Sequence, residues 1–292
     1  MSSDCGKALR LGRIISPKSK RAVCVAFDHG LDIGPMPGIV DARAAMQKLV
    51  DGGADAVLVS PGIARLCADL FAGKDAPSLI LRLDWTNIWR PIEQLSYEEG
   101  RTRMIATVED AMRLGADAVL SFMFVGYNDP DVEAEEVAKN GVISRECEAV
   151  GMPHFIEPMA RGRKIAARAM EDEIIAFHVR MAAELGADAI KTDYSGSPEK
   201  YRAVTEACHV PILIAGGPKT NSVKEGLEMV EGAMRAGAAG TLLGRNILQA
   251  EDPARMLQAM RGIVHGGQSV DQAMAEHLST PMPEQRRVAA RA

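Results

Sequence analysis

The stretch GADAIKTDY, residues 186–194, has three counterparts elsewhere in the chain. Gly53 opens GADAVLVS, Gly115 opens GADAVLSF and Gly237 opens GAAGTLLG. The fifth residue after the glycine is a leucine in these three copies, but it is Lys191 in the fourth. The four copies predict four equivalent buried strands, one of which carries a lysine where the others carry leucine.

Short apolar runs alternate with longer stretches of helical periodicity through most of the chain. Apolar runs that do not alternate with polar residues are typical of strands buried on both faces, as in a parallel sheet covered by helices. We expect eight such strands, at residues 22–28, 55–60, 78–83, 117–125, 153–158, 187–193, 210–215 and 239–243.

The residues that precede these strands also alternate. The second, fourth, sixth and eighth strands begin with the glycine-alanine motif, whereas the third, fifth and seventh follow Pro77, Pro153 and Pro211. Alternate strands fill alternate interior layers in an eight-stranded barrel, so the pattern predicts a (β/α)8 TIM barrel. A doubly wound open sheet is the alternative, but it gives no reason for the alternation, and the nucleotide-binding motifs GxGxxG and GxxxxGK[ST] are missing from the sequence.

The predicted organisation is a single domain, residues 1–292, in which the barrel occupies about 20–265. Residues 266–292 read as a C-terminal extension, with one further helix in VDQAMAEHL and a tail. A length of 292 residues is normal for one such barrel.

The charge and cysteine content narrow the class of protein. The net charge is −5 with acidic and basic residues mixed along the chain, which argues against a nucleic-acid partner. An apolar run of about 18 residues, as a membrane span needs, is missing, and MSSDCGKALRLGR lacks the apolar core of a signal peptide. The five cysteines are odd in number and have no CxxC spacing, which favours free thiols. We therefore expect a soluble cytoplasmic protein with no membrane partner.

Lys191 lies where a leucine is expected, and an unpaired ammonium group is costly to bury. One interpretation is a structural ion pair with Asp193 or another acid. The other is a nucleophile, because burial favours the neutral amine, and a neutral amine attacks a carbonyl to form a Schiff base. A protonated imine withdraws electrons from the adjacent carbon–carbon bond, which is the requirement of aldol chemistry.

Other polar residues follow the strands at the same predicted end. Asp28 and His29 follow the first strand, and Glu157 interrupts the apolar run of the fifth, where an acid can serve either in an ion pair or in proton transfer. Asp84 ends the third strand and Arg161 follows the fifth. We expect Glu157 and Asp28 to be catalytic, and His29, Asp84 and Arg161 to contact the substrate.

The last two strands end in glycine-containing loops. ILIAGGPKT contains Gly216 and Gly217, and TLLGRNIL contains Gly244 and Arg245. These are the loops at which many barrels bind phosphate through backbone N–H groups, to which an arginine adds a charged fork. A phosphate site is predicted here. The six histidines have neither HxH nor HxxxH spacing, so we expect neither a metal nor another cofactor.

The motifs AFDHG, GADAIKTDYSGSPEKY, ILIAGGPKT and GTLLGRNIL resemble those of the class I, metal-independent aldolase superfamily, which includes archaeal-type fructose-bisphosphate aldolases, deoxyribose-phosphate aldolases and LacD-like enzymes. The resemblance extends over about residues 10–270. It implies a Schiff base on Lys191, an active-site role for Asp28, phosphate at the glycine loops and Arg245, and a homo-oligomer of the kind usual in this superfamily, which includes decamers.

One motif departs from the family pattern. Fructose-bisphosphate aldolases and the related aminodideoxyheptulosonate synthases carry Tyr-Pro-Arg-Gly after the fifth strand, where the tyrosine shuttles protons. This chain has Met159-Ala160-Arg161-Gly162, whereas Glu157 is similar to the glutamate of the LacD-like branch.

The predicted function is a class I aldolase-like lyase that acts on a small phosphorylated sugar or keto-compound. The segment GIVHGGQSVDQAMAEHL also resembles the heptulosonate synthases and the LsrF-type thiolase that uses coenzyme A. These two activities are the alternatives on the same scaffold. A non-catalytic phosphosugar-binding barrel, with Lys191 as an ion-pair partner, is the alternative from another class.

Overall fold

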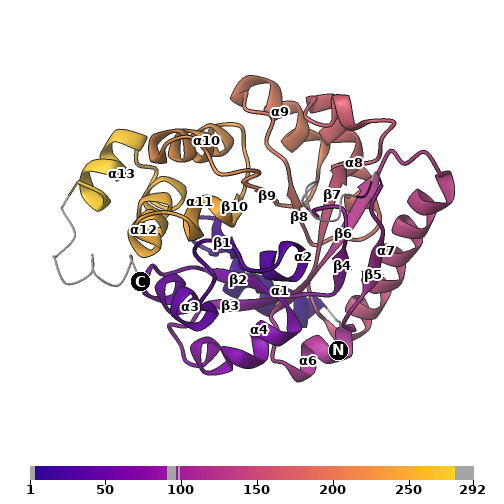
Figure 1. Ribbon diagram of the computed structural model, residues 1–292, viewed down its shortest axis with the longest axis horizontal. Helices are drawn as coiled ribbons and strands as arrows, with labels where there is room; N and C mark the ends of the chain where they lie inside the picture. Colours follow the sequence, from indigo (N-terminus) through magenta and orange to yellow (C-terminus); the bar gives the residue numbers. More distant parts are fainter. Residues whose placement is uncertain (1–3, 91–96, 98, 280–292) are drawn as a thin grey trace.

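The computed structural model describes residues 4–90, 97 and 99–279. Eight parallel strands close into a barrel in the spatial order β1-β10-β9-β8-β7-β6-β3-β2, and helices surround it (Figure 1). Every predicted strand is present, so the predicted (β/α)8 barrel is confirmed. The barrel strands are β1 (Ala22–Ala26), β2 (Ala56–Val59), β3 (Ser78–Arg82), β6 (Ala118–Val125), β7 (His154–Ala160), β8 (Ala189–Thr192), β9 (Ile212–Ile214) and β10 (Gly240–Leu243).

The helices that follow these strands form the outer layer. Several begin at a serine, threonine or aspartate whose side chain accepts a hydrogen bond from a backbone N–H of the first turn, as at Ser197, Ser222 and Asp252. The outer helices are α3 (Ala42–Asp51), α4 (Pro61–Leu66), α6 (Val108–Arg113), α7 (Pro130–Val150), α8 (Asp172–Glu184), α9 (Pro198–Ala207), α10 (Val223–Arg235) and α12 (Pro253–Val264).

The four repeated motifs occupy equivalent places in the barrel. Their glycines all have positive φ and end a helix just before the next strand; they are Gly53, Gly115, Gly186 and Gly237. The three leucines of the repeat lie in the barrel interior; they are Leu58, Leu120 and Leu242. Ala189 belongs to the same interior cluster. Side chains two apart on a strand share a face, so Lys191 also points into the barrel.

Several elements were not predicted. Helix α1 (Asp4–Ile14) closes the N-terminal end of the barrel, where Ile14 is buried against the interior cluster. The segment after the third strand contains an antiparallel hairpin of β4 (Asp84–Thr86) and β5 (Thr102–Met104), and β4 packs against β6. Short helices α2 (His29–Ile33) and α11 (Arg245–Leu248) follow β1 and β10.

The predicted helix of the C-terminal extension is present as α13 (Val270–His277), which packs on α12 and α10. The predicted tail, beyond residue 279, lies outside the described residues. Among the helices that the structure describes, none combines the length and apolarity that crossing a membrane requires.

Candidate active site

A cavity of about 450 Å³ opens at the end of the barrel where the strands finish. This is the end at which TIM barrels carry their active sites, because the loops that follow the strands meet there. Every predicted site residue except Asp84 lines the cavity: Asp28, His29, Glu157, Arg161, Lys191, Gly216, Gly217, Gly244 and Arg245.

Lys191 is the interior residue of β8 at the depth where three other strands carry leucine, and its side chain is only 9% exposed. Its Nζ lies 2.8 Å from Oε1 of Glu157 on the neighbouring strand β7. Asp193, the acid considered for this ion pair from the sequence, instead accepts two hydrogen bonds from Arg161, at 2.9 and 2.7 Å. The lysine therefore shares the cavity with a carboxylate that is placed to exchange its proton.

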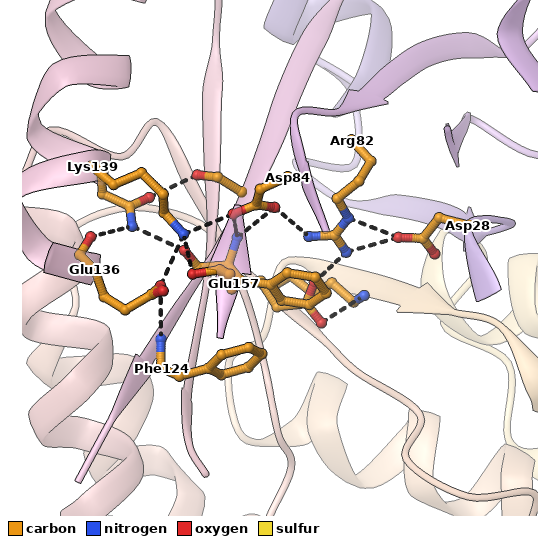
Figure 2. Close-up of polar contacts among 12 residues, drawn as sticks. Asp28, Arg82, Asp84, Phe124, Glu136, Lys139 and Glu157 are labelled. Atoms are coloured by element: carbon orange, nitrogen blue, oxygen red, sulfur yellow. Dashed lines mark hydrogen bonds and ion pairs between the residues drawn. The ribbon is translucent and has the colours of Figure 1, made fainter. Parts of the chain in front are cut away.

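Arg82 is the principal residue that the sequence analysis did not single out. It ends β3 and is the largest side chain buried within the described residues. Its Nη2 donates to Oε2 of Glu157 at 2.6 Å, its Nε donates to Oδ2 of Asp28 at 2.8 Å, and its guanidinium lies 3.7 Å from the ring centroid of Phe122 (Figure 2). Like Lys191, Arg82 is a charged residue in an otherwise apolar strand, within SLILRLDW, so the same pattern in the sequence could have identified it.

The chain of contacts thus runs from Lys191 through Glu157 and Arg82 to Asp28. Burial by itself raises the pKa of Asp28, but the charges of Arg82 and Lys191 outweigh it and lower that pKa to about 2. Burial lowers the pKa of His29, although the carboxylate of Asp28 opposes the change. At neutral pH the site therefore presents Asp28 as a carboxylate beside a neutral imidazole.

Asp84 does not line the cavity, although we expected it to contact the substrate. It lies on β4 behind the barrel wall, where it accepts from the backbone N–H of Phe122 at 3.0 Å and from Lys139 Nζ at 2.8 Å. Lys139, on α7, also donates to Glu136 at 2.9 Å (Figure 2). The reason for the difference is that the chain leaves the barrel after Arg82, so the side chain of Asp84 no longer follows the inward register of β3.

The loops after β9 and β10 line the cavity with glycines, so their backbone is not covered by side chains there. Gly217 has φ 58°, and a side chain at Gly244 would place its Cβ 2.0 Å from Cε1 of His29. Arg245 is next to Gly244, and its Nε has no hydrogen-bond partner among the residues that the structure describes. Burial lowers the pKa of Arg245. A half-buried guanidinium with an unused donor, beside two glycine loops, is an arrangement suited to an anion.

Strand β7 and the loop after it supply another part of the cavity lining. Arg161 belongs to this lining, but its charge is paired with Asp193, and its guanidinium lies 5.3 Å from the ring centroid of Trp89. Met159, which occupies the place of the family tyrosine, is buried and also lines the cavity. Within residues 4–90, 97 and 99–279, no three His, Cys, Asp or Glu side chains are grouped so that they could hold a metal ion.

The sequence of this chain is similar to those of known aldolases and of a related synthase. The family model for "DeoC/LacD family aldolase" matches residues 22–250. An uncharacterised aldolase of Saccharolobus solfataricus is 35% identical over 92% of this chain and 98% of its own length. The 2-amino-3,7-dideoxy-D-threo-hept-6-ulosonate synthase of Halobacterium salinarum is 34% identical over 94% of this chain and 97% of its own length.

Solved structures resemble the whole barrel. An archaeal fructose 1,6-bisphosphate aldolase superimposes with a TM-score of 0.77 at 30% identity, covering 89% of this chain and 99% of that one. A second structure of such an aldolase, with its catalytic lysine covalently bound to the carbinolamine intermediate of the substrate, gives a TM-score of 0.77 at 29% identity and covers 88% of this chain and 99% of that one.

Proposed function

Because the chain belongs to the DeoC/LacD family of aldolases, we propose that it is a class I aldehyde-lyase that makes or breaks a carbon–carbon bond through a Schiff base on Lys191. The observation that carries the proposal is the contact of Lys191 Nζ with Glu157 Oε1 inside the cavity. A buried lysine beside a proton acceptor can be converted to the neutral amine that attacks a ketone.

Glu157 is assigned the proton transfers at the imine. It takes the proton that Lys191 must lose before attack, and it returns a proton when the carbinolamine loses water. Both carboxylate oxygens are held, one by Lys191 and the other by Arg82, so the group is fixed in orientation as the lysine changes state. Asp28 is a carboxylate at the other side of Arg82, where it can accept a hydrogen bond from a substrate hydroxyl.

The substrate is assigned to phosphorylated sugars or keto-compounds. The free donor of Arg245 and the close backbone at Gly217 and Gly244 support a phosphate at the β9 and β10 loops. The ketone then lies toward β8, where Lys191 is located. The chemistry is proposed to need no metal ion, because the imine performs the electron withdrawal that a metal supplies in other aldolases.

A second candidate is 2-amino-3,7-dideoxy-D-threo-hept-6-ulosonate synthesis. Two relatives with that name, from Halobacterium salinarum and Archaeoglobus fulgidus, are 34% and 35% identical to this chain over almost its full length. That reaction is also carbon–carbon bond formation, so it differs from the first candidate in substrate rather than in the use of Lys191.

The test is inactivation by borohydride. Incubation with borohydride and a phosphorylated ketone should inactivate the protein and add the mass of the reduced ketone, whereas borohydride alone should do neither. Activity that survives prolonged EDTA treatment supports the metal-independent class, and consumption of coenzyme A would instead indicate the thiolase. Absence of an adduct with every phosphorylated ketone and ketose tested would contradict the proposal.

A further inference from the structure

Asp32 is an acid in the cavity to which the mechanism above gives no role. It lies on α2, one turn after His29, and it is 7% exposed while lining the cavity. Its Oδ1 is buried and, among the described residues, has no hydrogen-bond partner. Since buried polar atoms are nearly always hydrogen-bonded, an unpartnered carboxyl oxygen on a residue that lines a cavity points to a bound group that completes the contact.

The groups around Asp32 favour its uncharged form. Burial is the largest influence and raises its pKa; the carboxylates of Asp28 and Glu157 act in the same direction. Arg82 and a hydrogen bond from the backbone of Thr86, on the strand β4 that packs against α2, act in the opposite direction. On its own helix, His29 is the other titratable group. The balance raises the pKa of Asp32 to about 8, so the side chain is a neutral carboxylic acid at neutral pH.

The other acids of this cluster are held differently. Glu157 accepts from Lys191 with Oε1 and from Arg82 with Oε2, and Asp28 is a carboxylate whose Oδ2 accepts from Arg82. Met159, at the place of the family tyrosine, has no proton to exchange. Asp32 differs from these residues because it keeps a proton at neutral pH and has an oxygen without a hydrogen-bond partner among the described residues.

Its place in the barrel indicates which part of the substrate it meets. In the closed strand order, two strands separate β8 from β1 on one side, and two separate it from β3 on the other. Asp32 interacts with Asp28 and Arg82 at the ends of β1 and β3, across the barrel from Lys191. A substrate joined to Lys191 therefore presents to Asp32 the half that lies beyond the reacting carbon–carbon bond.

Resting on the proposed Schiff-base function, we propose that Asp32 is a catalytic acid that exchanges a proton with the oxygen of the aldehyde half of the substrate. In bond formation, the enamine on Lys191 forms the new carbon–carbon bond to the aldehyde carbon while the carbon–oxygen π bond breaks. The oxygen takes the proton of Asp32 and becomes a hydroxyl. Lys191 then carries an iminium cation and Asp32 is a carboxylate, so charge and protons balance. Bond cleavage runs the same step in reverse.

The test separates imine formation from carbon–carbon bond formation. The ketone that wild-type protein traps best with borohydride is chosen from dihydroxyacetone phosphate, hydroxyacetone and pyruvaldehyde. Its trapping rate, and its rate of addition to glyceraldehyde 3-phosphate or glycolaldehyde, are then measured in wild-type protein, Asp32→Asn and Asp32→Glu. Asp75→Asn serves as the matched control, because Asp75 is exposed and precedes β3, whereas the cavity lies where the strands end.

Asp32→Asn should trap the ketone at the wild-type rate but form the carbon–carbon bond about 10²–10⁴-fold more slowly, the usual contribution of general acid catalysis. The wild-type rate of addition should fall above about pH 8, as Asp32 loses its proton. That decline should disappear in Asp32→Asn and return in Asp32→Glu. Asp75→Asn should match the wild type in both reactions.

Three results would overturn the proposal. Equal rates of addition in Asp32→Asn and wild type would remove Asp32 from the reaction. An equal loss of trapping and addition would show that it acts on the imine or on the fold. A wild-type protein that traps no ketone, or traps one without adding it to either aldehyde, would overturn the proposed function on which this role rests.

Stability gives an independent readout. Between about pH 4 and pH 8 an aspartate in the unfolded chain is ionised, whereas Asp32 in the folded protein keeps its proton. The wild type therefore loses stability relative to Asp32→Asn as pH rises through this window. The melting temperature of Asp32→Asn, compared with that of wild type, should increase from pH 4 to pH 8. A difference that does not change with pH would contradict the uncharged, buried state.

Discussion

The two ends of the barrel both contain paired carboxylates, but the pairs serve different purposes. At the N-terminal end, Asp55 accepts from the backbone N–H of Val23 at 2.6 Å and from Arg261 at 2.7 Å. At the C-terminal end, Glu157 accepts from Lys191 and Arg82 beside a cavity of about 450 Å³. Asp55 links β1 to the outer helix α12, whereas Glu157 and Lys191 line a cavity.

The comparison shows that a buried ion pair does not by itself mark a functional site. A second example lies between β4 and α7, outside the barrel. There Lys139 forms ion pairs with Asp84 and Glu136, but these residues do not line the cavity. The C-terminal end differs because its paired charges border a cavity that a substrate could enter. Substitutions at the two ends should therefore separate activity from stability.

The largest effect on activity is expected from Lys191→Arg. A guanidinium remains protonated at all usable pH values and cannot form an imine, although it keeps the positive charge beside Glu157. By analogy with the loss of a nucleophile in other enzymes, kcat should fall on the order of 10⁴–10⁶-fold. Circular dichroism and melting temperature serve as the control for folding. Residual activity near the wild-type level would place the imine on another lysine.

Glu157→Gln should have the next largest effect. The amide keeps the shape of the side chain but cannot exchange a proton with Lys191, so kcat should fall about 10²–10⁴-fold. Asp28→Asn is the matched comparison, since Asp28 also accepts from Arg82, whereas the carboxylate that Lys191 contacts is that of Glu157. If Asp28→Asn lost kcat while Glu157→Gln kept it, the proton transfer would belong to the end of β1.

Arg245→Ala should weaken substrate binding more than turnover. A hydrogen bond to a charged group contributes about 1.5–3 kcal/mol, which corresponds to roughly 10- to 100-fold in KM. Inorganic phosphate should compete with the substrate in the wild type and lose potency by a similar factor in the variant. An unchanged KM would move the phosphate to another part of the rim.

Asp55→Asn should leave kcat and KM unchanged and lower stability by about 1–3 kcal/mol, because it weakens the contacts with Val23, Arg261 and His265. Burial raises the pKa of Asp55, but hydrogen bonds from these three partners lower it overall. The stabilisation is therefore present above the unfolded pKa of about 3.9 and lost as pH falls below it. Denaturant unfolding of the variant and the wild type at pH 7 and pH 3 measures this difference in stability. If Asp55→Asn lost activity without losing stability, the N-terminal end would also take part in the reaction.

The strands were predictable because all eight strands of a barrel occupy the same kind of environment and therefore have similar sequences. Each strand must be apolar on both faces, and each repeated glycine must end a helix with positive φ, as Gly53 and Gly186 do. The same repetition made Lys191 visible as an exception. Helix α1 and the β4–β5 hairpin lie outside the repeat, so no second copy existed with which to compare them.

The site was predictable where a side chain continues the register of a strand. Glu157 and Lys191 lie on the strands themselves, and the structure brings them together at 2.8 Å. Arg82 follows the same rule and was overlooked. Asp84 and Asp32 come after the chain has left its strand, at a hairpin and a short helix, where the alternation of inward and outward residues no longer holds. Their positions depend on loop geometry that the sequence does not encode in a simple pattern.

Lys191 is the residue that we propose forms the imine with the substrate. The most direct measurement is peptide mapping by mass spectrometry after borohydride reduction in the presence of a phosphorylated ketone that the enzyme traps. We expect one adduct per chain, located on Lys191, and no adduct in Lys191→Arg. An adduct on another lysine, such as Lys139 or Lys164, that persists in Lys191→Arg would contradict the proposal.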